Sequence, residues 1–143
     1  MITIKEEPPY VYYRGATFTV EWYVDPARRM KAKDYYEALS KDQQERLYYL
    51  VKYFAESPIG TRLPTTLYNL ENAEHKIYAF KPKSHRFFNF VTFDRKVIIL
   101  DAYRKHSQKM EKKDLHLLST AIEARRSYLK RVKEGIYYEG LSQ

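Results

Sequence analysis

Three short apolar stretches separated by tight turns lie between His75 and Tyr103, and their spacing limits the folds open to the chain. They span residues 75–81, 86–93 and 97–103, so four residues separate the first two stretches and three separate the last two. Short stretches rich in β-branched and aromatic residues are typical of strands. Strands joined this closely run antiparallel, because a parallel crossover needs a dozen residues or more. The sequence therefore predicts a three-stranded antiparallel meander.

A strand and two helices are predicted before the meander. Residues 16–25 alternate apolar and polar side chains, as in a strand with one buried face. Residues 34–57 carry apolar residues at helical spacing. Within them Ser40, followed three residues later by Gln43, has the pattern of a capping box. We therefore expect one helix to end just before Ser40, a longer one to begin just after it, and a loop over residues 59–74.

The length of 143 residues is that of a single domain. With 44% hydrophobic residues the chain can bury one core, and an amphipathic pattern over residues 111–133 predicts a terminal helix. We expect an irregular arm over residues 1–15, one domain over 16–134 and a loose tail over 135–143. The predicted fold class is α+β: an N-terminal strand, two helices, a three-stranded antiparallel meander and a C-terminal helix packed on the sheet.

The net charge of +8 is concentrated in one part of the sequence. Between His75 and Lys113, eleven basic residues stand against three acidic ones, so this segment carries the whole excess. Such a segment is typical of a surface that binds polyanions. A solvated basic surface without a specific ligand is the alternative.

Two classes of protein are excluded by what the sequence lacks. The chain has no cysteine, which excludes a thiol nucleophile and any metal site built from thiolates. No stretch approaches 18 apolar residues, and the first residues lack the basic and apolar regions of a signal peptide. We therefore expect a soluble, cytoplasmic protein with no membrane partner.

Three motifs follow one another in the meander, and a helix containing Ala121 and Tyr128 comes after them. The motifs are IYAFKP at 77–82, HRFFNF at 85–90 and VIILDAYRKHSQK at 97–109. In this order they resemble the RelE/HigB superfamily of type II toxin–antitoxin toxins, and in particular its phage-derived Gp49-like branch. The chain departs from the family pattern at four positions, where Ala79, Asp101, Ala102 and His106 stand in place of the usual Glu, His, Gly and Lys.

The resemblance implies a RelE-like toxin that cleaves translated mRNA on the ribosome, without a metal or other cofactor. It also implies a cognate antitoxin, expected to be a helix-turn-helix protein, that holds the toxin inactive. Operator DNA would then be bound only through the complex with the antitoxin.

RNA cleavage without a metal requires a catalyst for proton transfer and a cation that stabilises the phosphorane. Lys81 and Arg86 flank a short turn, so we expect both cations at one end of the sheet, beside the phosphate. His106 is the predicted general acid or base, because histidine ordinarily titrates near neutrality. Tyr103 is predicted to stack on a base or donate a proton. The predicted RNA contacts are Lys83, His85, Arg104, Lys105, Gln108 and Lys109.

Each of these roles has a structural alternative. Arg86 could pair with Asp101 on the adjacent strand. Tyr103 could be a core aromatic at the end of a strand, and His106 could be a solvated loop histidine. The lysines between Lys105 and Lys113 could form only the polar flank of the terminal helix, although cations at a helix N-terminus oppose its dipole.

Two other classes of function compete with the endonuclease. One is a non-catalytic protein of the same fold, either a ParE-like toxin that inhibits gyrase by binding or a phage-derived interaction module. Such a protein does not need the group of Arg86, Tyr103 and His106. The other is a general RNA-binding domain with exposed stacking aromatics, which ranks last because the sequence has no ribonucleoprotein motif.

Overall fold

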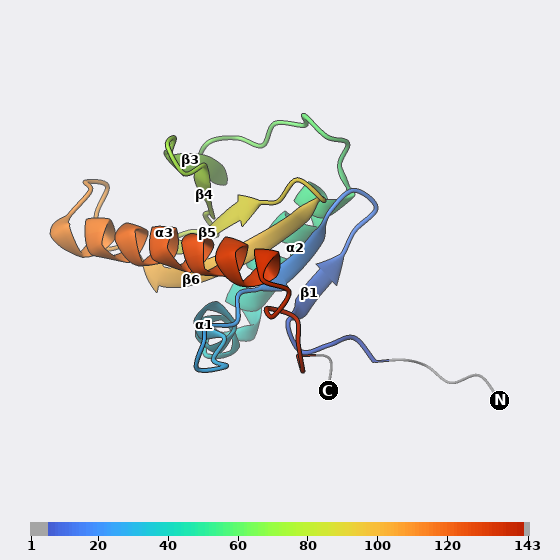
Figure 1. Cartoon of the computed structure of the whole chain (residues 1–143). Helices are drawn as coiled ribbons and strands as arrows, with labels where there is room; N and C mark the ends of the chain where they lie inside the picture. The colour runs from blue at the N-terminus through green and yellow to red at the C-terminus, as the bar shows by residue number, and fades with distance from the viewer. Residues whose placement is uncertain (1–5, 142–143) are drawn as a thin grey trace.

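The computed structural model describes residues 6–141, which form a six-stranded mixed sheet and three helices (Figure 1). The strands are β1 (Val11–Arg14), β2 (Thr19–Trp22), β3 (Tyr68–Asn72), β4 (Ile77–Phe80), β5 (His85–Val91) and β6 (Lys96–Arg104), and the helices are α1 (Lys31–Glu37), α2 (Lys41–Glu56) and α3 (Lys112–Lys133). The predicted α+β class is confirmed. The outermost parts of the predicted arm and tail, residues 1–5 and 142–143, lie outside the described residues.

The predicted meander forms the centre of the sheet, whose strand order is β1-β2-β6-β5-β4-β3. β4 pairs with β5, and β5 with β6, both antiparallel. β2 pairs with β6 in parallel, with Val20 opposite Val97 and Trp22 opposite Ile99. The predicted N-terminal strand therefore joins the meander through a long connection that contains both helices, which is the usual way to bring two parallel strands together.

Two edge strands correct the prediction. The arm predicted over residues 1–15 contains β1, and the loop predicted over 59–74 contains β3. In both strands the register shifts, between Val11 and Tyr13 in β1 and between Leu70 and Asn72 in β3. A bulge inserts a residue and breaks the alternation of apolar and polar side chains, so neither strand shows a clean period in the sequence.

The capping box predicted at the start of α2 is confirmed. The Ser40 hydroxyl accepts a hydrogen bond from the Gln43 backbone N–H at 3.3 Å, and the Gln43 side chain accepts one from the Ser40 N–H at 3.1 Å. α1 begins at Lys31, before the predicted start at Asp34. Within the described residues, no helix has both the length and the apolar composition needed to cross a membrane.

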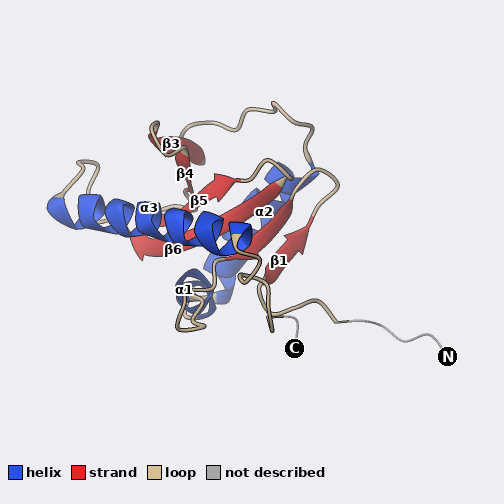
Figure 2. Ribbon diagram, in the orientation of Figure 1, coloured by secondary structure: helices blue, strands red, loops and turns tan. Residues whose placement is uncertain are grey.

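Helices cover both faces of the sheet (Figure 2). α3 packs on one face, over a core that includes Ile77, Phe88, Phe90 and Leu118. α2 packs on the other face, over a core that includes Val20, Trp22, Leu47, Val51 and Phe87. The sheet is therefore buried on both sides, and only its edges and its ends reach solvent.

The predicted loose tail is wrong for the segment directly after α3. Tyr137 is buried, and its hydroxyl accepts a hydrogen bond from the Val24 N–H at 2.8 Å. The Tyr138 hydroxyl lies 2.8 Å from a carboxylate oxygen of Glu21 and 2.7 Å from the Tyr128 hydroxyl. Burial of the Tyr137 ring, partial burial of the Tyr138 ring and their hydrogen bonds offset the entropy lost when the tail is ordered.

Candidate functional site

The predicted site residues gather at one end of the sheet, where the turn between β4 and β5 lies beside the end of β6. The Ser84 carbonyl accepts a hydrogen bond from the Lys105 N–H at 2.8 Å, which extends the pairing of the two strands past the end of β6. His85 lies opposite Arg104, and Arg86 lies opposite Tyr103. Antiparallel pairing thus brings together residues that are 17 to 21 positions apart in the sequence.

The site residues are divided between the two faces of the sheet, because successive side chains of a strand point to opposite faces. Arg86 shares a face with Phe88 and Tyr103, which belong to the core under α3. His85 lies on the other face, where its ring contacts Tyr35 of α1. Its partner in the pairing, Arg104, is exposed. The end of the sheet therefore presents cations on both sides.

Arg86 is fixed by the backbone of the turn that precedes it. Its Nη1 donates hydrogen bonds to the carbonyls of Lys83 and His85, at 2.7 and 3.0 Å. Asp101, the alternative partner, lies opposite Phe88, and within residues 6–141 it forms no ion pair with Arg86. The other donors of the guanidinium have no partner in the same part of the chain and can bind an oxyanion.

Two lysines flank the same turn. Lys81 is half-buried, and its ammonium donates a hydrogen bond to the Thr65 carbonyl at 3.2 Å. The pairing of Phe80 with Phe87 makes Lys81 and Arg86 the next pair along the two strands. Lys83 is exposed and has a positive φ of 55°. Three cations therefore lie on or beside one short turn, and the sequence predicts this position for two of them, Lys81 and Arg86.

His85 is a buried histidine with a specific partner. It is 5% exposed, and its Nδ1 lies 2.6 Å from the Tyr35 hydroxyl oxygen. Burial lowers the pKa of His85, and the charges of Arg104 and Arg86 lower it further. His85 is thus neutral near pH 7. No sequence signal points to Tyr35, because the contact joins residues 50 positions apart.

The stability of the protein is expected to depend on the protonation of His85. Its pKa is lowered from 6.5 in the folded state, so the unfolded chain binds more protons between the two pKa values. The contribution of His85 is complete above about pH 6.5 and is lost as the pH falls through the lowered pKa. His85→Gln should flatten this part of the curve when urea unfolding is measured from about pH 5 to about pH 8.

Tyr35→Phe provides the comparison for that experiment. It removes the hydroxyl next to His85 but leaves the burial and the two arginines that lower the pKa. We expect Tyr35→Phe to lower the free energy of unfolding by about 1 kcal/mol at every pH and to leave the dependence of that free energy on pH unchanged. If the free energy of unfolding of His85→Gln depended on pH as strongly as that of the parent, the pH dependence would come from another group.

Tyr103 and Lys105 belong to a network around Asp114, at the start of α3. The Lys105 ammonium lies 3.0 Å from Asp114 Oδ2, and the two side chains are 13% and 7% exposed. The same carboxylate oxygen accepts a hydrogen bond from the Glu111 N–H at 2.8 Å. Burial raises the pKa of Tyr103, and the charge and hydrogen bond of Asp114 raise it further. This network holds the end of β6, and the loop that follows it, against α3.

The loop after β6 presents the other predicted residues to solvent. His106, Gln108 and Lys109 are exposed, and the His106 side chain makes no hydrogen bond or ion pair within residues 6–141. Tyr103, by contrast, is 7% exposed, and its ring lies 5.5 Å from that of Phe88. The burial of Tyr103 agrees with its structural alternative, a core aromatic. The exposure of His106 agrees with its own, a solvated loop histidine. The catalytic and binding roles of these residues remain predictions.

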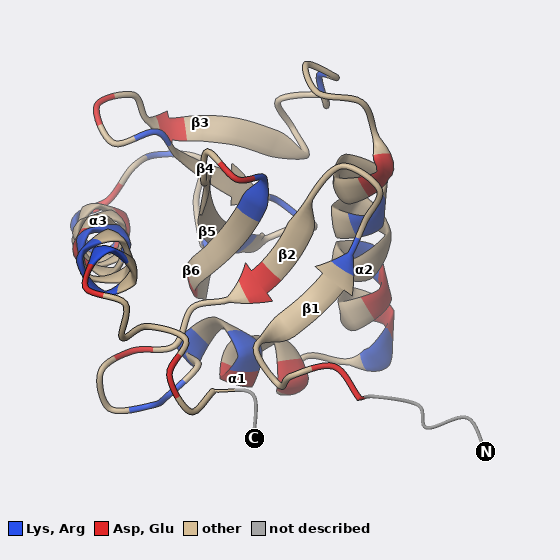
Figure 3. Ribbon diagram, turned by 45° about the vertical axis from the view of Figure 1, so that its right-hand side comes forward, with Lys and Arg blue, Asp and Glu red and all other residues tan. Residues whose placement is uncertain are grey.

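Two further observations concern the charged residues of the helices and the side chains that could bind a metal. The sequence of α3 carries seven Lys and Arg residues against two Asp and Glu, whereas Figure 3 shows acidic and basic residues mixed on α2. In the described part of the chain, no three His, Asp or Glu side chains are grouped as metal ligands.

Comparison with protein families gives one match, and it covers the candidate site. A family model described as "Phage derived protein Gp49-like (DUF891)" matches residues 34–123, from α1 into α3. This is more than half of the 143 residues, and it includes every predicted site residue from Lys81 to Lys109. No curated protein matches the chain.

Proposed function

The chain belongs to the phage-derived Gp49-like family, a family of RelE-like toxins of toxin–antitoxin systems, and from this we propose that it is a toxin that cleaves mRNA on the ribosome. The family membership agrees with the resemblance seen in the motifs of the meander. We further propose that a cognate antitoxin, a helix-turn-helix protein, binds the toxin and keeps it inactive. Operator DNA would be contacted through that complex.

The observation that best supports cleavage is the environment of Arg86. Its guanidinium is anchored by two backbone carbonyls next to Lys81 and Lys83, and its other donors have no partner among residues 6–141. A cation held in place before the reaction stabilises the charge that develops on a phosphorane without reorganising first. We assign this role to Arg86 and a supporting one to Lys81.

The other roles follow from exposure. His106 is open to solvent, and we propose that it transfers a proton at the ribose 2′-hydroxyl or at the leaving 5′-oxygen when RNA is bound. The exposed residues Lys83, Arg104, Gln108 and Lys109 are proposed to contact RNA. Tyr103 and His85 are buried and Lys105 is bound to Asp114, so these three residues are better suited to position the end of the sheet than to bind RNA.

A non-catalytic toxin of the same family is the second candidate. It is favoured by the burial of Tyr103, whose pKa is raised by burial and by the nearby Asp114, and by the lack of a partner that orients His106 within residues 6–141. Such a protein would act by binding alone, as a gyrase inhibitor or as a phage-derived interaction module.

Induction of this protein alone is expected to arrest bacterial growth, and co-expression of the protein encoded by the adjoining gene should restore it. Mapping of mRNA ends in the arrested cells separates the two candidates, because only the endonuclease produces new 5′ ends on translated messages. Arrest with intact messages would favour the non-catalytic toxin. Normal growth at a high level of folded protein would exclude a toxin of either kind and leave the phage-derived interaction module.

A further inference from the structure

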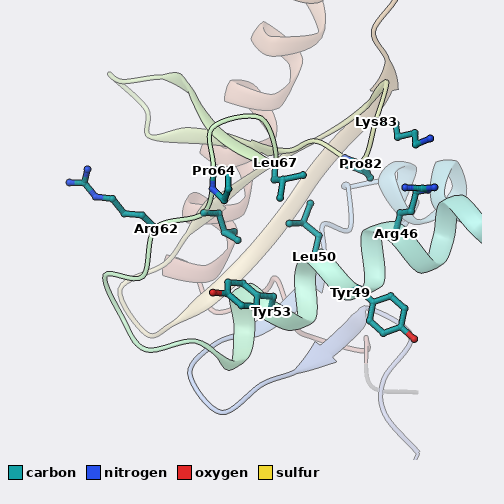
Figure 4. Close-up of a pocket in the computed structure, with 10 residues that line it drawn as sticks. Arg46, Tyr49, Leu50, Tyr53, Arg62, Pro64, Leu67, Pro82 and Lys83 are labelled. Atoms are coloured by element: carbon teal, nitrogen blue, oxygen red, sulfur yellow. The ribbon is translucent and has the colours of Figure 1, made fainter.

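A groove of about 560 Å³ lies between α2 and the loop that precedes β3, next to the candidate site (Figure 4). Its apolar lining comes from α2 and from that loop, and includes Leu50, Leu63, Pro64 and Leu67. A volume of this size accommodates several side chains of a ligand.

The groove is bordered by aromatic side chains that the fold leaves uncovered. Tyr49 is 64% exposed, Tyr53 is 56% exposed, and Leu67, inside the groove, is 39% exposed. Figure 4 shows the two tyrosines along the α2 side of the groove. Contiguous apolar surface of this kind on a small domain marks a site of interaction, and tyrosine is enriched at the anchor points of protein interfaces.

Cations lie at the ends of the groove. In Figure 4 Arg62 stands at one end, and Arg46 and Lys83 stand at the other. No acidic residue lines the groove in the described part of the chain. Arg46 has an exposed ion pair with Asp42 at 3.1 Å, and such a pair is worth at most about 1 kcal/mol, so it can be exchanged for another carboxylate. The charge therefore complements an acidic ligand.

We propose that the groove binds an amphipathic, acidic segment of the antitoxin, and this inference rests on the proposed function. Apolar side chains of the segment would fill the space over Leu63 and Leu67, and its carboxylates would face Arg62 and Lys83. The floor of the groove is aliphatic, and it favours a protein ligand whose apolar side chains pack on it, because RNA bases would find flat aromatic and guanidinium groups for stacking only at the border of the groove.

The position of the groove links this partner to the candidate site. Pro82 and Lys83, which line the groove, belong to the turn between β4 and β5. The carbonyl of the same Lys83 accepts the 2.7 Å hydrogen bond that holds Arg86. A segment bound in the groove contacts the turn that positions Arg86 and occupies Lys83, a proposed RNA contact. Binding of the antitoxin and binding of RNA therefore oppose each other, and each weakens the other by the same factor.

The test measures the affinity of the purified protein encoded by the adjoining gene for the full chain and for two groove variants. Tyr49→Ala removes an exposed aromatic, and Arg62→Glu reverses a charge at the end of the groove. Each is expected to weaken binding by about tenfold or more. Phe93→Ala, at the fully exposed tip between β5 and β6, and Lys52→Glu, on α2 outside the groove, are the matched controls and should bind as the parent does.

The outcomes separate this inference from the function on which it rests. If the parent chain does not bind the neighbouring protein, the proposed function and this inference both fail. If the parent binds and the groove variants bind equally well, the groove is not the docking site, although the toxin function stands. If the groove variants lose affinity for a single-stranded RNA oligonucleotide instead, the groove is an RNA surface and the inference is overturned. Circular dichroism checks that each variant is folded.

Discussion

The Arg86→Ala protein is expected to cleave ribosome-bound mRNA about 100- to 1,000-fold more slowly than the parent, which corresponds to about 3 to 4 kcal/mol of transition-state stabilisation. In the phosphorane the phosphate oxygens carry more negative charge than in the bound RNA, so an interaction with Arg86 strengthens as the reaction proceeds. The anchoring of Nη1 at 2.7 and 3.0 Å means that the guanidinium needs little rearrangement to make it. Single-turnover cleavage on purified ribosomes measures the chemical step directly.

Two further variants show whether the loss arises from charge, from geometry or from binding. Arg86→Lys keeps the charge but loses the planar fork, so its rate should lie between those of the parent and of Arg86→Ala. Lys112→Ala removes an exposed cation at the start of α3 and should weaken binding without changing the single-turnover rate. Parental cleavage by a folded Arg86→Ala protein would show that another residue stabilises the charge.

The parts of the fold that the sequence predicts well depend on local patterns. Ser40 and Gln43 cap α2 through contacts three residues apart, and the short turns of the meander leave its strands no parallel alternative. The parts that it misses depend on distant contacts. β1 and β3 are edge strands with bulges, and their conformation is stabilised by pairing with β2 and β4. A chain segment of this kind carries little periodic signal of its own.

The candidate site divides in the same way. Lys81 and Arg86 stand on either side of one turn, so both cations lie at one end of the sheet. This placement can be predicted from the sequence. The pairing register decides which face of the sheet each side chain occupies. Helices that are distant in the sequence decide which of these groups are buried. His85 is covered by Tyr35 of α1, and Lys105 is bound to Asp114 of α3. The Asp114 contact had a local signal, the acidic pair of Glu111 and Asp114 that caps α3.

Lys105→Ala is expected to lower the free energy of unfolding by about 3 kcal/mol, because it leaves the buried carboxylate of Asp114 without its cation. This loss is at the low end of the range for breaking a buried ion pair, because two other groups still donate hydrogen bonds to Asp114. Burial opposes the ionisation of Asp114, but hydrogen bonds from the Glu111 N–H, Lys105 and Tyr103 outweigh it and hold its pKa below the ordinary value of 3.8. Urea unfolding near neutral pH measures the loss.

A double-mutant cycle separates the ion pair from the effect of an uncompensated charge. Asp114→Asn keeps an acceptor for the Glu111 N–H but removes the charge, so Lys105→Met should cost less in that background than alone. The pH adds a second test. A carboxyl whose folded pKa is lowered stabilises the protein above its ordinary pKa, and this stabilisation is lost as the pH falls through the lowered value. Asp114→Asn should therefore lose stability at neutral pH and lose less of it on acidification below about pH 4. Equal costs of Lys105→Met in both backgrounds would mean that Lys105 acts through packing of its aliphatic stem and not through Asp114.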